Sequence, residues 1–115
     1  MSFEGDIAAT LRTVCPRVFP DVAPAGTQRP YATYQLYGGY VINPVGNEPP
    51  GKRSAFVQVN VWSATRLEAN NLIRQVEDAM RTTALFQAKP DSALRSTYEE
   101  DGPVYGAMQD YACWY

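Results

Sequence analysis

Hydrophobic and polar residues alternate with a period of two across residues 54–62, SAFVQVNVW. Ala55, Val57, Val59 and Val61 occupy every second position. Because successive side chains of a strand point to opposite faces, this pattern predicts a strand whose valine face lies in the core. Its other face is polar in the middle and aromatic at both ends, and it carries Phe56, Gln58, Asn60 and Trp62.

The two aromatic ends of that second face allow two interpretations. Phe56 and Trp62 can simply pack beneath loops. Alternatively they form part of a partner surface, because tryptophan and other aromatic residues are enriched at protein interfaces. The sequence leaves both open.

The period changes to helical spacing after Ser63. Thr65 and Glu68 fit a capping box, in which the threonine hydroxyl accepts from an early helical N–H and the carboxylate accepts from the cap N–H. Apolar residues then recur at the spacing of one helix face, namely Ala69, Leu72, Ile73, Val76, Ala79 and Met80. The helix is expected to end near Thr82, because threonine is a poor helix former.

The first third of the chain predicts a helix and two strands. Ser2 can cap an amphipathic helix that includes Cys15 and stops at Pro16. Residues 17–19 are expected to form a brief edge strand. Residues 31–40, YATYQLYGGY, predict a strand with a bulge, a bend or its end at the Gly38-Gly39 pair.

The last third predicts three short extended segments. Residues 84–89 form a strand or an irregular link, residues 94–100 form a strand, and a tight turn at 101–103 leads to a final strand over 104–115. The final strand places Gln109, Tyr111 and Cys113 on one face. The order of elements predicts an α+β fold, a mainly antiparallel sheet with two helices packed on one face.

Residues 41–52, VINPVGNEPPGK, form the least regular stretch. Three prolines and two glycines prevent it from joining a sheet throughout. Long loops inside compact domains are usually functional or disordered. The segment is therefore either a loop tip without a role or an arm that becomes ordered on contact with a neighbour.

Composition indicates one domain, residues 1–115, able to bury a core. No apolar run is long enough to span a membrane, and the N-terminus lacks the pattern of a secretion signal. The formal net charge is -2 and the isoelectric point is near 5.0. Such a charge disfavours tight binding to DNA phosphates. Two cysteines far apart in the sequence, Cys15 and Cys113, are expected to be free, buried thiols.

The sequence offers little for catalysis or cofactor binding. It has no histidine, which removes the commonest general base and metal ligand. Glu99, Glu100 and Asp101 lack the ligand spacing of a calcium loop and are expected to be a solvated turn. We therefore expect no enzyme activity, no cofactor and no metal.

Four stretches together resemble one family. They are the short N-terminal helix, residues 18–24 leading to Pro30-Tyr31 and a tyrosine-rich strand, the strand 57–62 passing directly into 64–69, and the aromatic end at Trp114-Tyr115. The pattern resembles the tail-terminator or tail-completion proteins of siphophages, prophages and gene-transfer particles. The block 57–69 is the most specific of the four.

The resemblance implies a structural virion protein at the head-proximal end of the tail, assembled in the host cytoplasm. It implies a homo-oligomeric ring, a hexamer, that caps the tail tube, stops its growth and contacts the head-tail connector or stopper protein. Genome DNA would only pass through the lumen, and no membrane partner is implied. The family supplies no catalytic motif.

Candidate interface residues follow from exposure and chemical character. They lie in the arm 41–52 and on the aromatic ends of two strands, and they are Tyr37, Tyr40, Asn43, Pro44, Asn47, Glu48, Phe56 and Trp62. Two alternatives to the terminator function stay open. One is a neck or stopper protein that joins head and tail. The other is a small ligand-binding or enzymatic domain with an aromatic pocket beneath the arm.

Overall fold

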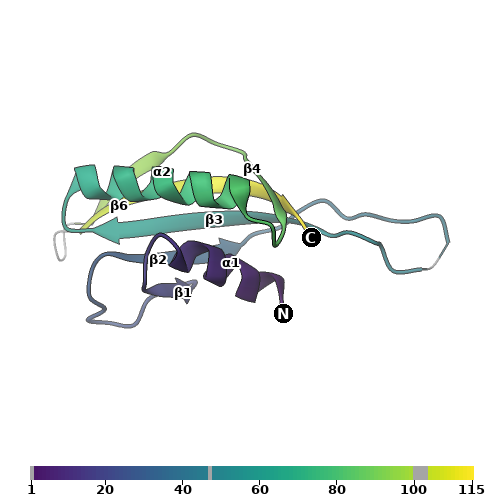
Figure 1. The fold of residues 1–115 in the computed structure, drawn as a ribbon, viewed down its shortest axis with the longest axis horizontal. Coiled ribbons are helices and arrows are strands. Elements are labelled where there is room, and N and C mark those ends of the chain that lie inside the picture. The colour runs from purple at the N-terminus through teal and green to yellow at the C-terminus, as the bar shows by residue number, and fades with distance from the viewer. Residues whose placement is uncertain (1, 47, 100–103) are drawn as a thin grey trace.

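A computed structural model of the chain describes residues 2–46, 48–99 and 104–115 (Figure 1). The elements in chain order are α1 (Phe3–Arg12), β1 (Val18–Pro20), β2 (Tyr31–Leu36), β3 (Ser54–Ser63), α2 (Arg66–Thr82), β4 (Gln87–Pro90), β5 (Arg95–Glu99) and β6 (Val104–Trp114). The strand order is β1-β2-β3-β6-β4, and β5 also pairs with β6. Only the β1–β2 pair is parallel among these strands. The predicted α+β class with a mainly antiparallel sheet is confirmed.

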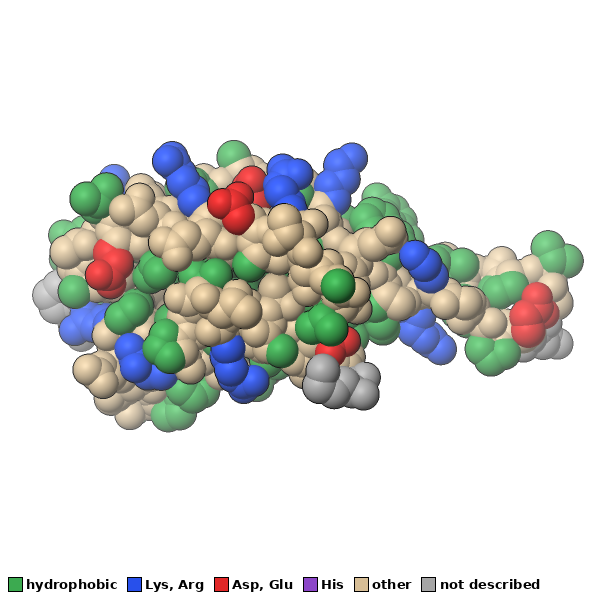
Figure 2. Space-filling model, viewed as in Figure 1, with side chains coloured by type: hydrophobic (Ala, Val, Ile, Leu, Met, Phe, Trp, Pro, Cys, Tyr) green, Lys and Arg blue, Asp and Glu red, His purple; other side chains and the backbone are tan. Residues whose placement is uncertain are grey.

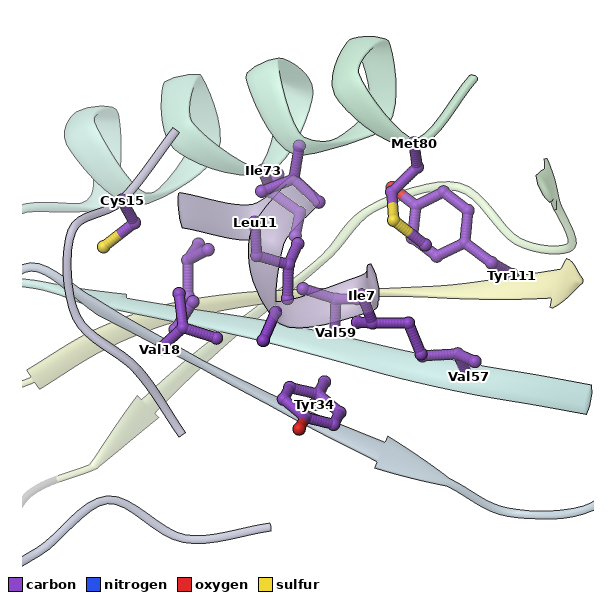
Figure 3. Packing of buried hydrophobic residues seen from close by; sticks show 14 of the residues in the cluster. Ile7, Leu11, Cys15, Val18, Tyr34, Val57, Val59, Ile73, Met80 and Tyr111 are labelled. Carbon is purple, nitrogen blue, oxygen red and sulfur yellow. The ribbon is translucent and has the colours of Figure 1, made fainter. Parts of the chain in front are cut away.

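The core lies between the sheet and the two helices. Val57, Val59 and Val61 have no exposed surface, as the alternation of β3 predicts. Apolar side chains from both helices reach the same layer, including Ile7 from α1 and Ile73 from α2 (Figure 3). Each fully buried aliphatic side chain contributes about 1.5–3 kcal/mol. Both helices pack on the face of the sheet that carries these valines. The other face carries Phe56, Gln58, Asn60 and Trp62.

Two boundaries differ from the prediction. The strand expected over 31–40 is regular only as far as Leu36. Gly38 and Gly39 follow it with positive φ angles of 137° and 152°, at the pair where a bulge, a bend or the end of the strand was expected. The first helix ends at Arg12, so Cys15 follows the helix instead of belonging to it. Cys15 is nevertheless buried, as expected.

One of the two predicted hydrogen bonds of the α2 capping box forms as expected, and the other is replaced. The Thr65 hydroxyl accepts a hydrogen bond from the Glu68 N–H at 3.2 Å. The Glu68 carboxylate, however, accepts from the Ser63 hydroxyl, while the Thr65 N–H donates to Ser63 Oγ at 3.4 Å. A hydroxyl at the end of β3 therefore stands between the carboxylate and the cap N–H and ties the strand to the helix.

Candidate assembly surfaces

The arm, residues 41–52, projects beyond one end of the sheet (Figure 1). The molecule measures 53 × 25 × 23 Å, and its radius of gyration is 15.0 Å. A compact chain of this length would have a radius of gyration of about 13 Å. Among the described residues, no backbone hydrogen bond joins two members of the arm. The described part of the arm therefore has no helix or strand.

The arm exposes apolar side chains. Val41 and Val45 are 83% and 99% exposed, and Ile42 is 40% exposed. Figure 2 shows hydrophobic side chains along the arm and basic side chains where it meets the body. Apolar groups kept in water on a projecting segment are typical of a surface that a partner covers.

The arm begins in a cluster of three aromatic rings. Phe56 of β3 is half-buried beneath Tyr37 and Tyr40, with ring centroids 5.8 and 5.2 Å away. The backbone continues the ladder here, because the Tyr37 N–H donates to the Phe56 carbonyl at 2.9 Å and the Phe56 N–H donates to the Gly38 carbonyl at 2.8 Å. Phe56 thus packs under chain leading into the arm, while Tyr37 and Tyr40 stay exposed.

A hollow of about 370 Å³ lies where the two legs of the arm meet the sheet. Tyr40, Val41 and Ile42 line it from one leg, and Lys52 and Arg53 line it from the other. Reciprocal hydrogen bonds between the backbones of Arg53 and Tyr115, at 2.7 and 2.9 Å, fix the second leg to the end of the chain. We call these five lining residues, Tyr40, Val41, Ile42, Lys52 and Arg53, the arm-base surface.

Trp62 lies at the other end of β3, apart from the arm. Its ring is 6.5 Å from that of Tyr31, its direct partner across the β2–β3 ladder. Gly106 of β6 lies on its other side, where an added Cβ would come within 2.9 Å of the indole. Trp62 and Tyr31 line a second hollow of about 240 Å³ together with Asp21, Val22 and Glu99. We call these five residues the distal hollow.

Polar side chains connect the two ends of the uncovered face. The Gln58 amide donates to Asp110 Oδ1 at 3.3 Å, and Arg95 donates to Asp110 Oδ2 at 3.1 Å. The Asn60 amide donates to the Gln58 carbonyl oxygen at 3.4 Å. The side chains satisfy one another, so the middle of this face is hydrophilic without being strongly charged.

The structure groups only some of the predicted interface residues. Tyr37, Tyr40 and Phe56 come together at the arm base, whereas Trp62 belongs to a separate surface. Asn43, Pro44 and Glu48 lie on the arm, and Asn47 lies outside the described residues. Their participation in an interface stays a prediction.

Sequence reasoning missed Tyr31, Val22 and Glu99 as neighbours of Trp62. Tyr31 was part of a recognised strand, but only the β2–β3 register places it beside the indole. Val22 belonged to a loop, and nothing in the pattern showed that its side chain would be 77% exposed.

Burial keeps the two cysteine thiols of the interior protonated. Burial raises the pKa of the Cys113 thiol to about 12, and burial also raises the pKa of Cys15. Both thiols are free.

Within residues 2–46, 48–99 and 104–115, no group of three or more acidic or cysteine side chains is placed to hold a metal ion. Glu100 and Asp101 lie outside these ranges. No helix in the same ranges is long and apolar enough to cross a membrane.

Residues 4–115 match the protein family described as tail completion protein gp17, and the chain belongs to this family. It is thus a structural component of a phage tail. No curated protein matches the chain.

Solved structures share the fold. The structure of the gp17 protein of bacteriophage SPP1 is 16% identical, with a TM-score of 0.58 over 96% of this chain and 86% of that chain. A second solved structure is 12% identical, with a TM-score of 0.54 over 96% of this chain and 89% of the other.

Proposed function

We propose that this protein caps the completed tail tube as a hexameric ring, stops tube growth and forms the joint to the head connector. Family membership supports the tail-completion function, and the ring extends it. The protein would occupy the head-proximal end of the tail after assembly in the host cytoplasm. Its partners would be further copies of itself, the tube protein and the connector, and it would act without catalysis.

The projecting arm is the observation that carries this proposal. Its apolar side chains and its unpaired backbone groups have no partners among the described residues of the same chain. Contact with a neighbour would bury the side chains and pair the backbone, at the entropic cost of ordering the segment. A ring provides such a neighbour for every copy.

The excess of acidic over basic residues is compatible with a lumen through which DNA passes. The basic residues number 10 and the acidic residues 12, with five basic and eight acidic residues over positions 66–115. A net negative ring would not retain DNA phosphates. The genome would slide through without binding.

Deletion of residues 43–50 tests the proposal. We expect the shortened chain to keep its fold, because none of the buried core residues lies in that range. We expect it to fail in a phage that lacks the intact gene, giving few completed particles. Substitution of the exposed Arg74 on α2 by alanine is the matched control and should complement normally. Normal particle yield with the deletion would show that the arm is dispensable for assembly.

A further inference from the structure

We infer that successive copies in the ring are joined head to tail, with the arm-base surface of one copy against the distal hollow of the next. The inference rests on the proposed ring and names the two surfaces that close it. The occupant of the distal hollow is therefore a second copy of this chain.

The two surfaces lie far apart on one molecule. Ser54, at the start of β3, borders the arm-base hollow, and Trp62, eight residues later, borders the distal hollow. A strand rises about 3.3 Å per residue, which separates them by about 26 Å. Contacts between two different patches produce closed rings when the rotation fits, whereas a self-complementary patch stops at a dimer. Two separate patches on one molecule are what a ring contact requires.

The apolar parts of the two surfaces complement each other. Val22 stands out beside the distal hollow on a turn that starts at Asp21, whose φ is 58°. Two backbone hydrogen bonds hold this turn, from the Asp21 N–H to the Tyr34 carbonyl at 2.8 Å and from the Val22 N–H to the Pro20 carbonyl at 2.6 Å. Val22 is thus a fixed apolar projection at the distal end of the molecule. The arm-base hollow, the larger of the two, lies at the other end and is lined by exposed aromatic and aliphatic side chains.

The two surfaces also carry charges of opposite sign. Two basic residues, Lys52 and Arg53, line the arm-base hollow, and two acidic residues, Asp21 and Glu99, line the distal hollow. None of these four forms an ion pair within the described part of the chain. Burial raises the pKa of the Tyr31 hydroxyl, and the positive charge of the nearby Arg29 offsets part of this increase. The distal hollow therefore also has one basic residue nearby.

Two further hollows among the described residues fit the arm base less well. The groove between α1 and α2 is lined by small and aliphatic residues and threonines, and it offers no carboxylate. The hollow beside β4 is lined by Arg81 and Lys89, which would repel Lys52 and Arg53. Of these hollows, charge complementarity favours the distal hollow. Exposed ion pairs contribute little affinity, so the charges would mainly set which surfaces meet.

Charge reversal on each surface tests the pairing. The donor variant carries Lys52→Glu with Arg53→Glu, and the acceptor variant carries Asp21→Lys with Glu99→Lys. All four side chains are exposed, so both variants should fold, as circular dichroism and thermal unfolding will verify. We expect each variant alone to reduce completed particles at least about tenfold, because like charges then meet at every contact.

Co-expression of the two variants provides the decisive measurement. In an alternating ring, the reversed donor meets the reversed acceptor and each unchanged surface meets an unchanged surface. We expect an equal mixture, and also the chain that carries all four substitutions, to restore completion. Alternation needs an even number of copies, which a hexamer provides.

Three outcomes would overturn the inference or the function beneath it. If the acceptor variant assembles normally while the arm deletion fails, the arm docks elsewhere and only the head-to-tail pairing is wrong. If both variants fail and the mixture stays defective, the two surfaces do not meet. If the deletion and both variants all assemble normally, the proposed role of the arm is wrong as well.

Discussion

Replacing Gln109 by leucine should destabilise the protein more than any nearby surface change. Gln109 of β6 is only 2% exposed and joins three parts of the fold. Its amide donates to Glu77 Oε1 of α2 at 2.7 Å and to the Ser92 carbonyl at 2.9 Å. Its carbonyl oxygen accepts from the Tyr111 hydroxyl at 3.0 Å. Leucine keeps the volume and removes all three bonds.

The magnitude follows from what is left unpaired. A hydrogen bond to a charged acceptor contributes about 1.5–3 kcal/mol, and a buried polar group without a partner costs about 1–3 kcal/mol. Tyr111 has no exposed surface, so its hydroxyl would lose its partner without gaining water. The Glu77 side chain is 33% exposed and also accepts from Arg81, which offsets part of the loss. We expect a net loss of about 2–4 kcal/mol in the free energy of unfolding.

Urea unfolding of Gln109→Leu, Tyr111→Phe and the double variant measures this loss. The double variant should be less destabilised than the sum of the single variants by about 1–2 kcal/mol, because it removes both partners of one hydrogen bond. Additive effects, or a loss below about 0.5 kcal/mol for Gln109→Leu, would refute the network as a source of stability.

The same variant should change the pH dependence of stability. The hydrogen bond from Gln109 is the main cause that lowers the pKa of Glu77 below its ordinary value of 4.5. A lowered pKa stabilises the fold above the unfolded-state value, and this contribution disappears as the pH falls through the folded-state pKa. The difference between wild type and Gln109→Leu should therefore shrink in acid. A constant difference would contradict the assignment.

Three further predictions concern thiols, backbone and cap. Cys15 and Cys113 should resist thiol reagents in the folded protein, and stability should fall as the pH rises from 9.0 towards 12, because burial disfavours the Cys113 thiolate; rapid labelling would contradict this. Gly39→Ala should cost about 1–3 kcal/mol, since φ is 152° and an added Cβ would clash with the Ser54 carbonyl group of β3, whereas Gly51→Ala has open space and should be neutral by thermal unfolding. Thr65→Ala should lower unfolding stability by about 1 kcal/mol through loss of the α2 cap, and an unchanged midpoint would refute it.

Local patterns were sufficient for most of the fold. The change from period two to helical spacing predicted β3 and α2, because both signals depend on neighbouring residues. The regular part of β2 stops earlier, at Leu36, although backbone hydrogen bonds continue from Tyr37 and Gly38 to Phe56. The Gly38-Gly39 pair predicted an irregularity in the strand but not which residue ends its regular part.

The candidate surfaces were harder to predict because they depend on register. Tyr31 and Trp62 are 31 positions apart and meet only through the β2–β3 ladder. Gln109 was correctly assigned to the same face as Tyr111. Its burial beside Glu77 follows from packing across 32 positions, which no local pattern contains.

Tail length measures the proposed terminator function most directly. The measurement is electron microscopy of a lysate from the encoding phage after deletion of this gene. The proposal predicts overlong tubes beside filled heads without tails, restored to uniform length by the wild-type chain. Tails of normal length left unattached to heads would contradict tube capping and assign the protein to the neck. Intact, infectious particles would contradict any need for it in tail completion.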